Sequence, residues 1–168
     1  MDTEFAVRMV DITKHFGTIT ANKNVSLDIR KGEILSLLGE NGSGKTTLMN
    51  MLSGIYYPDG GSIYVNGTRV DIRSPKDAFK LHIGMIHQHF KLVDVLTAAE
   101  NIILGLEGKS VLDMKKVVQD IQEVTERYGF ELDPNQKIYD MSVSQKQTVE
   151  IVKMLYRGAN ILILDEPT

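Results

Sequence analysis

The spacing of hydrophobic residues predicts strands in the first part of the chain. Residues 6–12 and 25–29 alternate between apolar and polar side chains, as half-buried strands do. Residues 63–70 have the pattern of a β-hairpin, with Asn66 and Gly67 at its type I′ turn. We expect this hairpin to pair with the two N-terminal strands in an antiparallel sheet.

Three short runs of continuous hydrophobic residues predict strands that are buried more deeply. They are residues 34–38, which we expect to form a buried parallel strand, residues 83–86 and residues 161–164. A helix should follow the first run, because residues 48–52 have helical spacing and stop at Gly54. Strands and helices therefore alternate around a common core.

Between residues 96 and 157 the strand signals disappear and helical spacing replaces them. Residues 98–104 and 144–157 are expected to be helical. An apolar stripe through residues 117–128 predicts a further helix that ends at Gly129. A helical insert thus interrupts an α/β core.

Composition limits the kind of protein that this pattern can build. The chain has 168 residues, 42% hydrophobic and 24% charged, with a net charge of −3. That mixture is typical of a soluble globular domain, and the absence of a basic stripe argues against nucleic acid as a partner. There are no cysteines, which fits a reducing compartment and excludes disulfides. No apolar run approaches the roughly twenty residues of a membrane helix, so we expect a cytosolic protein that reaches a membrane only through a partner.

The most informative chemistry lies between the first buried run and the helix after it. Residues 39–47 match the G-x-x-x-x-G-K-[ST] pattern of a phosphate-binding loop, in its strand–turn–helix context. Glycines let backbone N–H groups face an anion, and the helix N-terminus adds the positive end of its dipole. Lys45 can reach the β- and γ-phosphates, and the Thr46 hydroxyl can bind Mg²⁺. The expected nucleotide contacts in this loop are Gly39, Asn41, Gly42, Ser43, Gly44, Lys45, Thr46 and Thr47.

Two carboxylates, Asp165 and Glu166, follow the last hydrophobic run. In a phosphate-loop NTPase the first such acid holds Mg²⁺ through water, and the second polarises the attacking water. A strand that ends in two acids is weak evidence by itself. In the same chain as a phosphate loop, it indicates an NTPase.

Four other residues have more than one interpretation. Gln88 follows a strand end, where it would face whatever the phosphate loop holds. His87 and His89 could suggest a metal site, but no further ligand lies at the required spacing. Phe16 precedes Gly17 and could stack on a base, although an aromatic at this position more often covers the edge of a core.

Together these motifs resemble the nucleotide-binding domain of an ABC transporter. The resemblance rests on residues 34–47, Gln88, residues 141–147 and residues 161–168, which span nearly the whole chain. Residues 84–90 and 149–159 are similar to ATPase subunits that import simple sugars or nucleosides, and residues 90–97 favour the nucleoside branch.

The resemblance implies roles for individual residues. Phe16 would stack on adenine, Thr47 would contact the α-phosphate, and Gln88 would sense Mg²⁺ and the γ-phosphate. The region from about residue 89 to 105 would press on the membrane permease. The expected catalytic residues are Glu166, Lys45 and Gln88, and the expected Mg²⁺ ligands are Thr46, Gln88 and Asp165.

Residues 142–147 resemble the signature motif, which contacts the ATP of an opposing domain in a head-to-tail dimer. The expected contacts are Ser142, Ser144 and Gln145. Ser142 and Gln145 also have the spacing of a helix capping box, which is compatible with phosphate binding at the same helix start. Ser144 replaces the second glycine of the usual motif, and a Cβ there would cost about 1 kcal/mol if the backbone required positive φ.

The expected fold is α/β, a P-loop NTPase with a RecA-like core, an antiparallel β subdomain and a helical insert. Residues 1–88 and 159–168 would form the core with its β subdomain, and residues 89–158 the helical subdomain. The family continues past residue 168 into elements that are missing here, so we expect an N-terminal fragment, truncated at its C-terminus and inactive alone.

The function expected from this resemblance is ATP hydrolysis that energises uptake of a nucleoside or simple sugar, with ATP and Mg²⁺ as cofactors. The expected partners are membrane permease subunits, a second nucleotide-binding domain and, indirectly, an extracellular binding protein, at the cytoplasmic face of the cell membrane. Two alternatives remain: a nucleotide-binding module with little hydrolysis of its own, and a soluble ABC ATPase outside transport.

Overall fold

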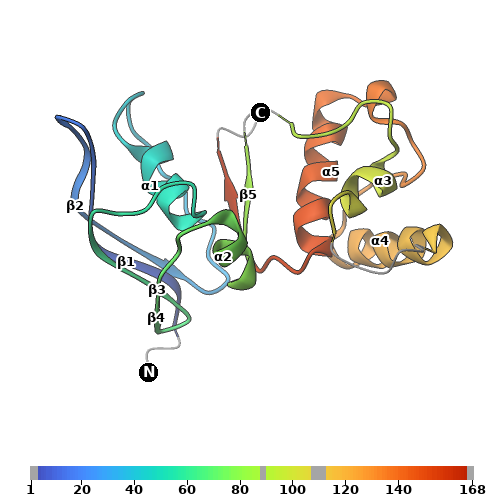
Figure 1. Ribbon diagram of the computed structural model, residues 1–168. Coiled ribbons are helices and arrows are strands. Elements are labelled where there is room, and N and C mark those ends of the chain that lie inside the picture. The colour runs from blue at the N-terminus through green and yellow to red at the C-terminus, as the bar shows by residue number, and fades with distance from the viewer. Residues whose placement is uncertain (1–3, 88–89, 107–112, 166–168) are drawn as a thin grey trace. The chain divides into compact units, whose positions relative to one another are not determined.

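The computed structural model describes residues 4–87, 90–106 and 113–165. The chain divides into two compact units, Met1–Gly84 and Met85–Thr168, which are considered separately (Figure 1). The predicted grouping of residues 1–88 with residues 159–168 stays a prediction.

The first unit contains a four-stranded antiparallel sheet. Its strands are β1 (Phe5–Phe16), β2 (Ile19–Arg30), β3 (Gly60–Val65) and β4 (Thr68–Val70), in the order β2-β1-β3-β4. Asn66 and Gly67 join β3 to β4 with positive φ angles of 50° and 78°, as a type I′ turn requires. The predicted hairpin, and its pairing with the N-terminal strands, are confirmed.

Helix α1 (Lys45–Leu52) shares the core of this unit with the sheet. Three apolar side chains of β1 and three of α1 are buried. These core residues are Val7, Met9, Ile12, Leu48, Met51, Leu52, Ile63 and Val65. A short second helix, α2 (Pro75–Lys80), has Ser74 as its N-cap, whose side chain accepts from the N–H of Asp77.

The run at residues 34–38 does not form the buried strand that its apolar sequence predicts. These residues have no regular secondary structure, and Ile34 and Leu38 are 97% and 93% exposed. A parallel strand needs a hydrogen-bonding neighbour and cover on its faces. The sheet of the first unit is the antiparallel one, with the order β2-β1-β3-β4, and it does not include these residues.

The second unit combines a small sheet with helices. Strand β5 (Ile83–Ile86) crosses the boundary between the units and pairs with β6 (Ile161–Leu164), and the carbonyl of Ile86 accepts from the N–H of Asp165 at 3.1 Å. The helices are α3 (Ala98–Ile103), α4 (Met114–Tyr128) and α5 (Val143–Tyr156), with a 3₁₀ turn, η1 (Ile138–Asp140), before α5. These helices confirm the predicted helical stretches, although α4 begins three residues before the predicted stripe, and Gly129 ends α4 with φ of 73°.

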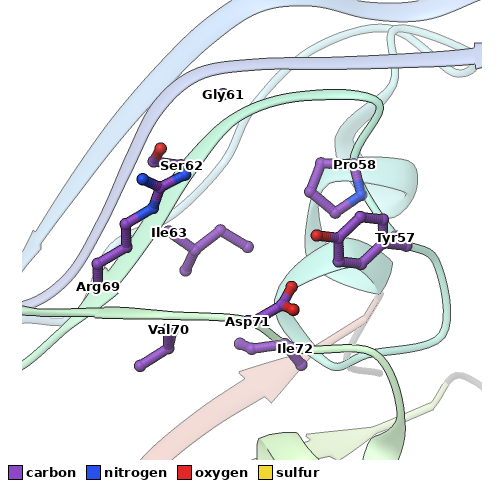
Figure 2. Close-up of a pocket in the computed structure, with 9 residues that line it drawn as sticks. All are labelled: Tyr57, Pro58, Gly61, Ser62, Ile63, Arg69, Val70, Asp71 and Ile72. Carbon is purple, nitrogen blue, oxygen red and sulfur yellow. The ribbon is translucent and has the colours of Figure 1, made fainter.

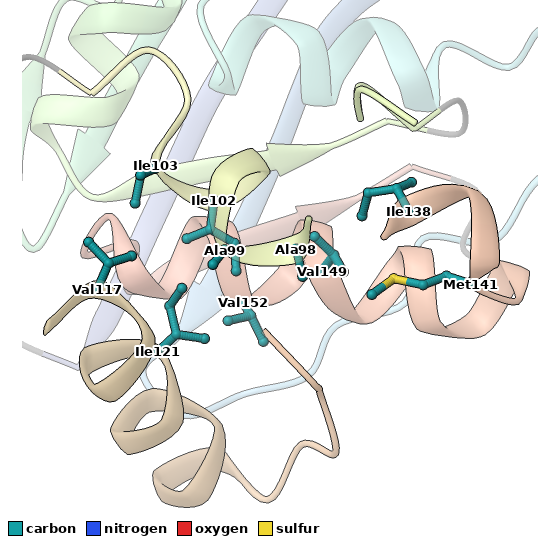
Figure 3. Close-up of a cluster of buried hydrophobic side chains, with 10 residues drawn as sticks. All are labelled: Ala98, Ala99, Ile102, Ile103, Val117, Ile121, Ile138, Met141, Val149 and Val152. Carbon is teal, nitrogen blue, oxygen red and sulfur yellow. The ribbon is translucent and has the colours of Figure 1, made fainter. Parts of the chain in front are cut away.

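The helices of this unit enclose one hydrophobic cluster (Figure 3). All three helices and η1 contribute to it, with α5 at its centre. Its members are Ala98, Ala99, Ile102, Ile103, Val117, Ile121, Ile138, Met141, Val149 and Val152. Nonpolar burial of this kind is the main source of stability for such a unit.

Asn101 ties the segment before α3 to that helix. Its Oδ1 accepts from the N–H of Val93 at 2.7 Å, and its Nδ2 donates to the carbonyls of Val93 and Thr97 at 3.1 and 2.9 Å. The side chain is fully buried, so these hydrogen bonds offset the cost of removing an amide from water.

Among the described residues, no helix is both long and apolar enough to cross a membrane.

Candidate functional site

The glycine-rich loop turns directly into helix α1. Gly42 and Gly44 have positive φ angles of 82° and 91°. A Cβ at Gly44 would lie 2.5 Å from the carbonyl oxygen of Ala21 and 2.9 Å from Nδ2 of Asn22. Only glycine fits this position, because both the backbone angle and the lack of space exclude a side chain.

The start of α1 has the features of an anion site. Gly44 is the N-cap and makes no side-chain cap hydrogen bond. The first N–H groups of a helix have no partner within the helix, and they carry the positive end of its dipole. Lys45, Thr46 and Thr47 form the first turn, so the predicted phosphate contacts stand where an anion would be stabilised.

The Lys45 ammonium lies against the loop that precedes it. Its Nζ donates to the carbonyls of Gly39 and Glu40, both at 2.8 Å, and is 3.5 Å from the Ser43 hydroxyl. These contacts hold the Lys45 ammonium, the one cation in residues 39–47, against the backbone of the loop. Asn41, Gly42 and Ser43 are exposed.

Phe16 ends strand β1 and is 41% exposed. The Tyr56 ring meets it edge-on at a centroid distance of 5.0 Å, and Lys14 Nζ lies 5.6 Å from its centroid. Lys14 is held in place by the carbonyl of Tyr57 at 2.7 Å and by Asp59 at 3.0 Å. Phe16 is therefore supported by neighbours and still has ring surface open to solvent, which a stacking residue needs.

In the second unit Asp165 directly follows β6. Its backbone N–H is bonded to Ile86, which fixes its place at the end of the β5–β6 pair. The predicted partners Gln88 and Glu166 lie outside the described residues, as does His89. Within the described part of the chain, no group of three His, Cys, Asp or Glu side chains could hold a metal.

The residues of the predicted signature motif cap helix α5. The N–H of Gln145 donates to the Ser142 hydroxyl at 3.3 Å, and the N–H of Ser142 donates to Gln145 Oε1 at 2.9 Å. The predicted capping box is confirmed. Ser144 lies in the first turn with its hydroxyl 3.0 Å from that of Ser142. Its backbone is helical, so the strain that positive φ would have caused is absent.

Sequence reasoning missed two buried polar residues near these motifs. Glu150 is 5% exposed, and its Oε1 accepts from the N–H of Lys91 at 2.9 Å. Burial lowers the pKa of the neighbouring Lys153, and the charge of Glu150 opposes this shift. Asn22 is 6% exposed, and its Nδ2 donates to the carbonyl of Gly44 at 3.3 Å. Glu150 stands on the apolar face of the helix predicted at residues 144–157, which was the available signal, whereas Asn22 lies outside the strands that the periodicity predicts.

The first unit also contains an open cavity of about 370 Å³, with no predicted nucleotide contact among its lining residues (Figure 2). The Tyr57 hydroxyl and the Asp71 carboxylate face each other there. Their hydrogen bond raises the pKa of Tyr57, and together with Arg73 it lowers the pKa of Asp71. The cavity is lined by Tyr57, Pro58, Gly61, Ser62, Ile63, Arg69, Val70, Asp71 and Ile72.

The chain is similar to known proteins over almost its whole length. The ABC transporter family matches residues 22–168. The guanosine import ATP-binding protein NupO of Bacillus subtilis (strain 168) is 53% identical over 167 residues, which are 98% of this chain and 33% of that protein. The nucleoside import ATP-binding protein NupA of Lactococcus lactis subsp. cremoris (strain MG1363) is 54% identical over 170 residues, 100% of this chain and 34% of that protein.

A solved structure agrees with these sequence relatives. CbiO1 of Clostridium perfringens, described as part of the ABC transporter complex CbiONQ, superposes with a TM-score of 0.82 at 26% identity. The superposition covers 98% of this chain and 66% of CbiO1. The chain therefore spans about a third of the length of the curated relatives and two thirds of this structural neighbour.

Proposed function

Because the chain belongs to the ABC transporter family, we propose that it is the nucleotide-binding part of an ATP-hydrolysing subunit that energises uptake of a nucleoside or simple sugar. Its fold is that of the ABC transporter ATPases, as the sequence predicts. The names of the two sequence relatives support the nucleoside branch in particular.

One observation supports nucleotide binding more than any other. The loop at residues 39–44 places Gly44 in a left-handed conformation, starts α1 without a side-chain cap and brings the Lys45 ammonium to the same turn. A polyphosphate requires both backbone donors and a compact cation in one place. Phe16, with its partly exposed ring, would receive the adenine.

In the proposed reaction, water attacks the γ-phosphate in line with the bond that breaks. Lys45 would absorb the negative charge that develops on the phosphate, and Glu166 would orient the water. Thr46 and Asp165, with Gln88, offer the hydroxyl, carboxylate and amide oxygens that suit Mg²⁺, and that ion would neutralise the phosphates when bound.

The proposed partners follow from the second unit. Ser142, Ser144 and Gln145 lie at an exposed helix start, where they would meet ATP held by a second nucleotide-binding domain. The region from about residue 89 to 105 would contact membrane permease subunits, and the protein would then act at the cytoplasmic face of the membrane. An extracellular binding protein would supply the solute to the permease.

Two measurements on the full-length protein test this proposal: Mg·ATP affinity and phosphate release. We expect Lys45→Ala to lose most of the affinity, and Glu166→Gln to keep the affinity and lose turnover. A wild-type protein that shows no Mg²⁺-dependent affinity for ATP would refute the proposal. Unchanged turnover in Glu166→Gln would exclude Glu166 as the base.

A second candidate function is a module that binds ATP and dimerises with little hydrolysis. Ser144 favours it, because a side chain bonded to Ser142 occupies the position where the family usually has glycine. Phosphate release per bound ATP separates the two functions. A Ser144→Gly variant that hydrolyses ATP much faster than wild type would favour this second candidate.

A further inference from the structure

A buried asparagine outside the recognised motifs, Asn22, donates a hydrogen bond to the predicted phosphate loop. Asn22 belongs to β2, and its backbone pairs with Lys14 of β1 at a point where the strand register is irregular. Such irregularities redirect side chains away from the regular alternation of a strand. Here the redirected side chain reaches Gly44, the last residue before α1.

The contact is specific to one peptide group. The carbonyl of Gly44 accepts from the N–H of Leu48 at 2.9 Å, as the first hydrogen bond of α1, and also from Asn22 Nδ2 at 3.3 Å. A trans peptide is planar, and its C=O and N–H point in opposite directions. Holding the Gly44 carbonyl against Asn22 therefore aims the Lys45 N–H outward, at the start of the helix where phosphate would bind.

The other side of the Asn22 amide has no evident structural use. Within the described residues, its Oδ1 is buried and has no hydrogen-bond partner. A buried acceptor without a donor destabilises a fold. If Asn22 served only to stabilise the core, an apolar residue of the same size would serve better, because the Gly44 carbonyl would keep its bond from Leu48.

We propose that Asn22 is a positioning residue for nucleotide binding: its amide orients the peptide between Gly44 and Lys45 so that the Lys45 N–H faces the polyphosphate. This inference rests on the proposed function. It attributes this orientation of the peptide to the hydrogen bond from Asn22 Nδ2 to the Gly44 carbonyl. Among the described residues, this carbonyl is the one backbone group to which the Asn22 side chain donates.

The test compares Asn22→Leu and Asn22→Ala with wild type in the full-length protein. Both variants remove the donor, Leu at similar size and Ala without any risk of a clash with Gly44. We expect the Kd for Mg·ATP to rise about 3- to 10-fold, the effect of one neutral hydrogen bond. We also expect the urea midpoint of Asn22→Leu to stay the same or rise, because the unpaired acceptor is gone.

Lys23→Leu is the matched control, since Lys23 is the next residue on the same strand and is exposed. It should leave both quantities unchanged. Inorganic tripolyphosphate, measured as a competitor of ATP, should lose affinity by the same factor in the Asn22 variants, because the argument concerns phosphates and not the base.

Three results would overturn the inference. They are an unchanged Kd in both variants, a loss for ATP that tripolyphosphate does not share, and a fall in stability of Asn22→Leu that parallels its loss of affinity. The last result would make Asn22 a support of the fold alone. A wild-type protein that binds no ATP would instead refute the proposed function, so the two failures are distinguishable.

Discussion

Lys14 lies next to Phe16, the residue predicted to stack on adenine. The ammonium lies near the Phe16 ring, and the Asp59 carboxylate and the Tyr57 carbonyl hold it there. A cation within about 6 Å of an aromatic ring is attracted to the electrons of the ring face, so Lys14 stabilises this position of Phe16. Sequence alone could not decide between a stacking role and a core-edge role for Phe16. These neighbours provide a preformed setting for stacking, and the role itself stays a proposal.

Asp59 gives this arrangement a dependence on pH. Its hydrogen bonds from the His15 N–H and from Lys14 hold its pKa below the ordinary value of 3.8. A carboxylate with a lowered pKa stabilises the folded state above its unfolded pKa, and this contribution disappears as pH falls through the folded value. We therefore expect Asp59→Asn to lower the free energy of unfolding at neutral pH, and the difference from wild type to shrink below pH 3.8.

Urea titrations between pH 3 and pH 7 would measure that difference. A double-mutant cycle with Lys14→Met is the control, since the effect of Asp59→Asn should be smaller once its cation is removed. A difference that is constant across the whole pH range would show that the Asp59 charge is not the cause.

At the scale of elements, short sequence motifs correctly predicted the turns and helix ends that are stabilised by neighbouring residues. The Asn66-Gly67 turn, the Ser142 cap and the Gly129 end each satisfy backbone groups within a few residues, and each is confirmed. The strand predicted at residues 34–38 was wrong for the opposite reason. Their apolar sequence is suited to a buried strand, but such a strand depends on distant neighbours that periodicity does not supply.

The candidate site divides in the same way. The phosphate loop could be proposed from sequence because glycines, Lys45 and the following helix are contiguous, and its binding of phosphate stays a prediction. Asn22 could not, since it reaches Gly44 only through the register of β2 on β1. Glu150 was missed because a lone carboxylate in an apolar helix face gives no indication that a backbone N–H 59 residues away will bond to it.

The capping box of α5 supports a quantitative prediction. Replacing Ser142 with Ala removes the acceptor for the Gln145 N–H and should destabilise the second unit by about 1 kcal/mol. Ser142→Asp restores an acceptor at the N-cap and should recover most of that loss. Urea unfolding followed by circular dichroism measures both. Equal stability of Ser142→Ala and wild type would contradict a stabilising cap.

For the whole molecule, each unit has a hydrophobic core of its own. Ile121 is fully buried in the cluster of the second unit, and that cluster contains no residue of the first. We expect Ile121→Ala to cost about 2–5 kcal/mol, through lost burial and the cavity left behind. Hydrogen exchange should accelerate in α3, α4 and α5 and stay unchanged in β1 and β2.

Leu132, which is only partly buried against the same cluster, offers a milder comparison. Leu132→Ala should accelerate exchange in the same helices by a smaller factor. Equal acceleration in both units after Ile121→Ala would mean that the chain unfolds as a single cooperative structure, contrary to the prediction.

The three hydrogen bonds of Asn101 have a mechanical consequence. Residues 93–97 cannot shift against α3 without leaving buried polar atoms unpaired, so the segment and the helix must move as one body. Ile102, one residue further along, belongs to the same hydrophobic cluster as Val149 and Val152 of α5. A displacement of residues 93–97 would therefore be shared by α3 and would disturb the cluster that α3 forms with α5.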